Sequence, residues 1–104
     1  MPAYFIVRAQ VSDPADRDAF DRWYCDEHLP DALNAFSARR AMRGWNHFDP
    51  AVHCAMYEFD TLAAAQAIQG SAVLKQLIAE FDRVWGTRVV RTRDLVEITQ
   101  VLPA

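Results

Sequence analysis

The chain has 104 residues, a length typical of one domain, because two shorter pieces would each be too small to bury a core. A net charge of −3 and a pI near 5.5 argue against non-specific nucleic-acid binding. No window is long and apolar enough to span a membrane, and residues 1–10 lack the features of a signal peptide, so we expect a soluble cytoplasmic protein.

Residues 3–11 are predicted to form a strand. Its odd positions are all apolar, whereas its even positions are mixed, namely Tyr4, Ile6, Arg8 and Gln10. One face of this strand therefore belongs to a core. The other face is expected to contact more polar surroundings, but not bulk solvent alone.

A helix is predicted next, from an N-cap at Asp13, with Pro14 at the first helical position, to about Leu29. Its buried stripe has the i, i+3, i+4, i+7/8 spacing and consists of Phe20, Trp23, Tyr24 and Glu27 or His28. Because Pro30 disfavours helical geometry at the residue before it, we expect a kink or break directly after His28.

Two more strands are predicted at residues 37–48 and 51–59, with Asp49 and Pro50 as the turn between them. The second of these strands is largely apolar on both faces. Cys54 is interpreted as a core residue of this strand. Together with Cys25 of the helix, it is not expected to form a disulfide framework.

Two consecutive helices are predicted next, each with its own N-cap and with a glycine at its end. Thr61 begins a helix that ends near Gly70, and Ser71 begins a longer helix that Gly86 ends. The longer helix carries an apolar stripe that includes Trp85.

The last strand is predicted over residues 87–102, with a bulge near residues 91–94, where the alternation lapses. The resulting order β-α-β-β-α-β predicts an α+β, ferredoxin-like fold, a four-stranded antiparallel sheet with its helices on one face. The uncovered face is expected to carry Tyr, Ile, Trp or Met instead of a run of Lys and Glu. A second sheet packed on that face would bury it, so we expect a symmetric homodimer.

The chain resembles the dimeric α/β-barrel superfamily, in particular the EthD-like and antibiotic-biosynthesis-monooxygenase-like proteins. The resemblance depends on the pattern Phe20-x-x-Trp23-Tyr24-x-x-Glu27-His28-Leu29-Pro30, followed by Phe36 and by Arg39-Arg40. It implies a dimer in which the two sheets pack together as an α/β barrel, in agreement with the homodimer expected above. It also implies a varied set of activities, among them cofactor-independent monooxygenases, lactone isomerases, and polyketide cyclases or dehydratases. In some of these relatives, the histidine that matches His28 faces the pocket and handles protons.

His28 is the main candidate for chemistry, since a neutral imidazole can accept or donate a proton near neutral pH. The alternative is a structural histidine at the C-terminal end of its helix, where the helix dipole favours the cation. Cys25 is three residues from His28 and could form a Cys-His pair, but the nearby acids would raise the thiol pKa, so a surface thiol is the preferred interpretation.

A metal site is not expected. His47 and His53 flank the Asp49–Pro50 turn, and a two-residue loop would place them on opposite faces of the sheet. No carboxylate or thiol completes a ligand set. His53 by itself remains a candidate pocket residue, in register with Tyr57.

Aromatic residues could line an apolar cavity, and the substrate-binding candidates are Trp23, Tyr24, Trp45, His53 and Tyr57, with Trp85 as a further aromatic residue. Each aromatic could instead be part of the core. The arginines of the second and last strands are expected to pair with acidic residues of the first helix and of a partner subunit. Alternatively, they could bind a carboxylate or enolate.

These residues predict a small-molecule enzyme that needs no metal or organic cofactor and acts on an apolar or aromatic metabolite. His28 would be its general acid or base, and Tyr24 or Tyr57 would donate a hydrogen bond to a developing oxyanion. The alternative is a non-catalytic dimer that holds a hydrophobic metabolite for another enzyme. A third hypothesis is haem handling, which needs a histidine with open space beside it.

Overall fold

Four strands form one antiparallel sheet in a computed structural model, which describes residues 1–103 of the chain. The strands are β1 (Ala3–Val11), β2 (Arg40–Trp45), β3 (Val52–Phe59) and β4 (Val89–Glu97), and they lie in the order β2-β3-β1-β4. The first strand of the chain therefore lies in the middle of the sheet, and the last strand lies at an edge. This is the strand order and orientation of the predicted ferredoxin-like fold.

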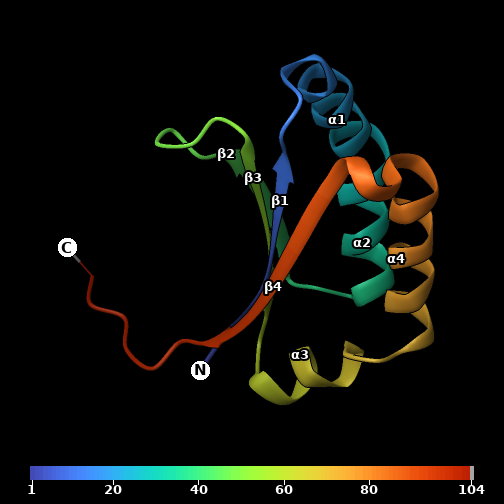
Figure 1. Cartoon of the computed structure of the whole chain (residues 1–104). Coiled ribbons are helices and arrows are strands. Elements are labelled where there is room, and N and C mark those ends of the chain that lie inside the picture. The colour runs from blue at the N-terminus through green and yellow to red at the C-terminus, as the bar shows by residue number, and fades with distance from the viewer. Residues whose placement is uncertain (104) are drawn as a thin grey trace.

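The helices are α1 (Arg17–Trp23), α2 (Leu29–Phe36), α3 (Leu62–Ile68) and α4 (Ala72–Trp85). Helices α1, α2 and α4 cover one face of the sheet, and α3 lies near one end of the strands (Figure 1). No helix formed by residues 1–103 covers the opposite face, as predicted. Within residues 1–103, none of the helices has the length and apolar character needed to cross a membrane.

The predicted helix caps are confirmed. The Asp13 carboxylate accepts a hydrogen bond from the backbone of Ala15, and the Thr61 and Ser71 hydroxyls each accept one from the backbone amide three residues ahead. Gly86 ends α4 with a φ of 56°, a left-handed conformation that glycine adopts without steric cost.

Of the kink or break predicted after His28, the break is wrong. Residues 24–28 form one wide π-helical turn, in which the backbone N–H of Leu29 donates to the carbonyl of Tyr24, and the helix continues as α2 to Phe36. Pro30 lies in the first turn of α2, where a missing N–H costs little. The wide turn therefore absorbs the proline without breaking the helix.

The strand boundaries also differ from the prediction. Ser37 adopts a left-handed conformation that ends α2, so β2 begins only at Arg40. It ends at Trp45, and a loop of six residues, instead of a two-residue turn, connects it to β3. β4 pairs with β1 in one unbroken register from Val89 to Glu97, so the predicted bulge at 91–94 is absent.

The covered sheet face and the helices form an aromatic core. The odd-numbered residues of β1 are all buried there, and Phe20 of α1 contacts six aromatic rings, those of Trp23, Tyr24, Trp45, His53, Phe81 and Trp85. Trp45 belongs to this face, because it pairs with the buried His53 across the sheet. The expectation that the uncovered face carries a Trp is therefore wrong, since the other two tryptophans lie in α1 and α4.

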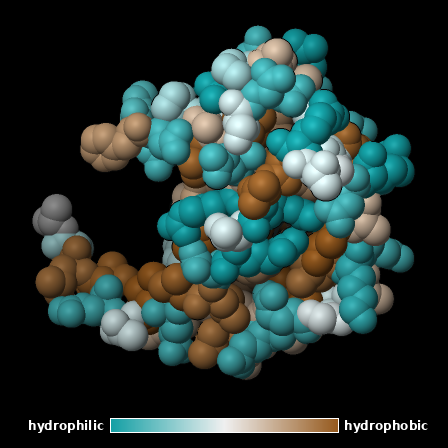
Figure 2. All heavy atoms as spheres, in the orientation of Figure 1, coloured by the Kyte–Doolittle hydropathy of each residue, from teal (hydrophilic) through white to brown (hydrophobic). Residues whose placement is uncertain are grey.

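The uncovered face has an apolar centre made by Ile6, Met42 and Met56, which neighbour one another across β1, β3 and β2. Cys54 lies half-buried on this face, so it is not a core residue as predicted. The loop between β2 and β3 and the C-terminal segment both project on this side of the sheet (Figure 1). Apolar residues lie along the C-terminal segment (Figure 2).

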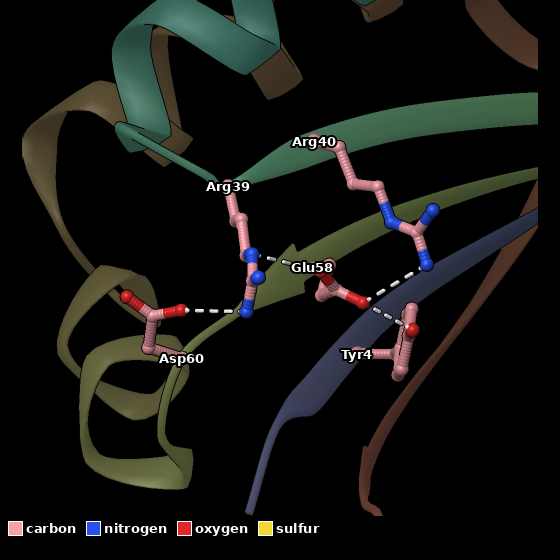
Figure 3. Close-up of polar contacts among 5 residues, drawn as sticks. All are labelled: Tyr4, Arg39, Arg40, Glu58 and Asp60. Atoms are coloured by element: carbon pink, nitrogen blue, oxygen red, sulfur yellow. Dashed lines mark hydrogen bonds and ion pairs between the residues drawn. The ribbon is translucent and has the colours of Figure 1, made fainter.

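At one end of the uncovered face, Glu58 is surrounded by partners (Figure 3). Its carboxylate accepts hydrogen bonds from the Tyr4 hydroxyl and from Arg40, and it lies 3.6 Å from Arg39, which also bonds Asp60. These contacts lower the pKa of the Glu58 carboxyl, the Tyr4 hydrogen bond most strongly.

Candidate functional site

A narrow pocket lies between the helices and the covered face of the sheet. About 330 Å³ of space inside it is free of atoms, open solvent at its mouth included, and the interior has room for about one water molecule. Its apolar wall consists of Phe5 and Val7 of β1, Ala32 and Phe36 of α2, and Leu74, Leu77, Ile78 and Phe81 of α4. The remaining lining residues are Tyr24, His28, Tyr57, Arg91 and Arg93.

His28 is held in this wall by the π-helical turn. Its ring stacks on Trp23 at 4.6 Å and 19°, and it meets the edges of Tyr24 and Phe81. Although only 8% of the residue is exposed, neither ring nitrogen hydrogen-bonds any residue among 1–103, and neither nitrogen is sealed from solvent. The nitrogens are therefore available to a molecule in the pocket.

The surroundings of His28 favour its neutral form. Burial lowers the pKa of His28 to about 4, the charge of Arg91 acts in the same direction, and Glu80 opposes both. The imidazole is therefore unprotonated at neutral pH. The alternative that His28 caps a helix C-terminus is wrong, because the helix continues for two more turns beyond it.

Tyr24 and Tyr57 add two hydroxyl groups to the pocket. Burial raises the pKa of Tyr24 to about 12, although the neighbouring Tyr57 hydroxyl acts in the opposite direction. Burial also raises the pKa of Tyr57, and Tyr24 adds to that effect. Both hydroxyls therefore keep their protons at neutral pH and serve as hydrogen-bond donors.

The edge strand β4 brings two arginines to the pocket. Arg91 is held over the ring of Phe81, 3.9 Å from its centroid, and donates to the Asp82 carboxylate at 2.5 Å. Arg93 is exposed, so it marks the side where the pocket meets solvent. The sequence suggested anion binding by the β2 and β4 arginines without indicating which of them face a pocket.

Three of the predicted binding residues lie outside the pocket lining. Trp23 lies behind His28 and supports its ring, whereas His53 and Trp45 belong to a separate cluster. In that cluster, Asp21 accepts hydrogen bonds from Arg43 at 2.7 Å and from Trp45 at 2.9 Å, and Arg43 contacts the His53 Nε2 at 3.3 Å. These interactions explain why β2 carries arginine and tryptophan here.

His53 is completely buried within this second cluster, and its Nδ1 has no hydrogen-bond partner among the described residues. Burial lowers the pKa of His53 to about 4, with Arg43 as the second cause. His47 lies in the exposed loop between β2 and β3, so it cannot act together with His53. Among residues 1–103, no three His, Cys, Asp or Glu side chains are grouped to hold a metal ion.

Cys25 does not pair with His28. It lies on the exposed side of the π-helical turn, whereas the His28 ring points into the core. The expected pairing of arginines with acidic residues of the first helical segment is present at Arg43 of β2, which pairs with Asp21, and at Arg88, just before β4, which pairs with Asp16.

The contribution of α2 to the pocket was missed, because Pro30 was interpreted as the end of the helix. Leu29, Ala32 and Phe36 continue the i, i+3, i+7 spacing, and this signal was present in the sequence. The contribution of α4 was predicted only as a core stripe, and the sequence has no feature that distinguishes core from pocket lining there.

No protein-family model matches the chain, and no curated protein matches its sequence. Solved structures do match its fold. An EthD family protein from Bacillus halodurans C-125 aligns with a TM-score of 0.71 at 20% identity, over 95% of this chain and 100% of that protein. A candidate antibiotic biosynthesis monooxygenase from Deinococcus radiodurans aligns with a TM-score of 0.71 at 12% identity, over 98% and 97% of the two chains.

SnoaB, a cofactor-independent oxygenase from Streptomyces nogalater, aligns with a TM-score of 0.61 at 15% identity, over 99% of this chain and 98% of SnoaB. At such identities the similarity establishes the fold alone. The chain thus has the ferredoxin-like fold of the EthD and antibiotic biosynthesis monooxygenase proteins, which confirms the predicted resemblance at the level of structure.

Proposed function

We propose that this protein is a small-molecule enzyme in which His28 acts as the general acid or base, without a metal or organic cofactor. The observation that carries the proposal is a largely buried, neutral imidazole that lines a pocket and whose nitrogens have no hydrogen-bond partner within residues 1–103. The ring nitrogens are not sealed from solvent, so a substrate that reaches His28 can exchange a proton with them.

The residues around His28 fit proton abstraction from an apolar or aromatic substrate. Neutral His28 accepts the proton, and the hydroxyl of Tyr24 or Tyr57 donates a hydrogen bond to the oxyanion that develops. The imidazolium is then stabilised by the anion that the same step creates. Trp23 fixes the ring by stacking, and the cluster of Trp45 and His53 supports Tyr24 from behind.

Substrate screening followed by variants of His28 tests this proposal. His28→Asn keeps a polar side chain but cannot relay a proton, so turnover should fall by roughly 10²-fold or more. The dimer and its melting temperature should change little. His47→Asn is the matched control, because it removes a histidine from an exposed loop. Equal turnover in the two variants would contradict the catalytic role of His28.

A non-catalytic binding dimer is the second candidate. It is favoured by the absence, among residues 1–103, of a carboxylate that hydrogen-bonds and orients the His28 ring, as general bases often require. A ligand that co-purifies with the protein and binds both wild type and His28→Asn, with no turnover in either, would establish it. The haem hypothesis required open space beside the histidine, and the pocket has room there for about one water molecule.

The proposed functional form is a homodimer that packs the two uncovered sheet faces together. Ile6, Met42 and Met56 make the centre of that face too apolar for a surface in contact with water. The β2–β3 loop and the C-terminal segment project on the same side (Figure 1), and each carries an exposed apolar residue, Phe48 and Leu102, that a second copy packed there could cover.

A further inference from the structure

The charged groups of the pocket are all of one sign. Arg91 and Arg93 line it, His28 is neutral, and no carboxylate of residues 1–103 is among the lining residues. The rest of the wall is apolar apart from the hydroxyls of Tyr24 and Tyr57. A pocket of this composition has a positive potential and favours a ligand that carries negative charge.

The two arginines differ in how far their charges are already compensated. Arg91 has only 12% of its side chain exposed, and it is held by the Asp82 carboxylate and the face of Phe81. Burial lowers the pKa of the Arg91 guanidinium, with Arg93 as the second cause. Arg91 is therefore a fixed part of the wall.

Arg93 has no carboxylate within salt-bridge distance among the described residues. It pairs with Val7 across the sheet, so its side chain leaves β4 on the covered face, where the pocket lies. The neighbouring acid, Asp94, points to the opposite face and pairs with Arg8. The Arg93 guanidinium is thus a free, planar donor of hydrogen bonds at the mouth of the pocket.

We propose that the pocket selects a flat apolar molecule bearing a carboxylate, which Arg93 binds at the mouth while the apolar part lies toward His28 and Tyr57. This inference rests on the proposed small-molecule site and defines its substrate class. Arginine matches the two oxygens of a carboxylate with two parallel hydrogen bonds, and no other free cation borders this pocket in the part of the chain that the structure describes. Because the interior has room for about one water molecule, entry of the ligand requires Arg93 to move outward and the walls formed by α2 and α4 to separate.

Binding of 1-naphthoate and of its neutral analogue 1-naphthamide to the ¹⁵N-labelled protein tests the inference. Two-dimensional NMR locates the site through the backbone amides of Ala32, Leu77 and Ile78, which line the pocket. We expect naphthoate to bind at least about 10-fold more tightly than naphthamide, as charge-assisted hydrogen bonds are the stronger kind. In Arg93→Gln this preference should disappear, and in Arg93→Lys part of it should remain.

Arg22→Gln is the matched control, because Arg22 is exposed and lies outside the pocket lining. It should leave the preference for naphthoate unchanged. Equal affinities of the two probes for the wild type, or equal behaviour of Arg93→Gln and Arg22→Gln, would overturn the carboxylate inference but leave a pocket for apolar ligands intact. If neither probe shifted the pocket amides, the pocket would not admit such molecules, and the proposed function would fail with it.

Discussion

Glu58 and His28 lie on opposite faces of the sheet and are almost equally buried, with 6% and 8% of the residue exposed. Glu58 is paired with the Tyr4 hydroxyl and two arginines (Figure 3), whereas His28 is surrounded by aromatic rings and makes no hydrogen bond within residues 1–103. The same degree of burial thus goes with opposite degrees of pairing.

The pKa values of both residues are lowered, and the two shifts have opposite meanings. At Glu58, hydrogen bonds from Tyr4 and Arg40 stabilise the charged form. At His28, burial destabilises the charged form. A partnered buried charge has a structural explanation, whereas an unpartnered buried imidazole beside a pocket is a candidate for function.

Disrupting the proposed dimer interface on the uncovered face should have the largest effect, which is on dimer dissociation. Ile6→Glu places a charge in the apolar centre of the proposed interface, so the dimer dissociation constant should rise by at least roughly 100-fold. Val73→Glu is the control, since Val73 is exposed on α4, away from that face. Sedimentation at micromolar concentration measures the change. A wild-type protein that sediments only at 11.9 kDa would contradict the dimer itself.

The two buried histidines of the covered face should make the free energy of unfolding depend on pH. Because the pKa of His28 and of His53 is lowered to about 4, the unfolded chain binds more protons than the folded one between about pH 4 and 6.5. The stability conferred by keeping each imidazole neutral is therefore fully present above pH 6.5 and is lost as the pH falls toward 4. Lowering the pH from 7.5 to 5 should reduce the free energy of unfolding by on the order of 2 kcal/mol for each of the two histidines.

Chemical denaturation at several pH values measures this loss. His28→Gln and His53→Gln should each reduce it by about half, and His47→Gln, in the exposed loop, controls for the removal of a histidine. A stability that stays constant from pH 7.5 to 5 in the wild type would show that the two imidazoles are protonated as easily in the folded protein as in the unfolded chain.

The sequence predicted the fold well because its signals there are local. The caps at Asp13, Thr61 and Ser71 and the stop at Gly86 each depend on a few neighbouring residues. It failed at Pro30, because a π-helical turn that accommodates proline depends on how the whole helix packs against the sheet.

The candidate pocket could be predicted only where its residues are close in the sequence. The i, i+4 relation of Tyr24 and His28 was visible in the sequence, and these two residues do meet in the structure. The expectation that Trp45 and His53 line the same cavity was wrong, because strand pairing brings them together in a second cluster with Asp21. The register that decides this depends on a loop whose length the sequence did not reveal.

Replacing each of the two buried residues with one that cannot ionise sharpens the comparison. Glu58→Gln removes the charge shared by Arg39 and Arg40, so the melting temperature should fall. His28→Leu replaces an unpartnered polar group by an apolar one of similar size, so the melting temperature at pH 7.5 should stay the same or rise. Thermal melts of both variants against the wild type decide the matter. A larger fall for His28→Leu than for Glu58→Gln would indicate a structural partner of His28.

The smallest expected effect concerns the charges near His28. Arg91 disfavours the imidazolium and Glu80 favours it, so Arg91→Gln should raise the pKa of His28 and Glu80→Gln should lower it. Each shift should be less than about one unit, since both charges act on His28 at a distance and burial is the larger cause. Titration of the His28 ring protons by NMR gives the two values, and Arg22→Gln serves as the control. Opposite shifts for Arg91→Gln and Glu80→Gln would show that the pocket charges reach the imidazole. Shifts of the same sign would mean that the substitutions act by loosening the packing of α4, and the electrostatic account of His28 would then be wrong.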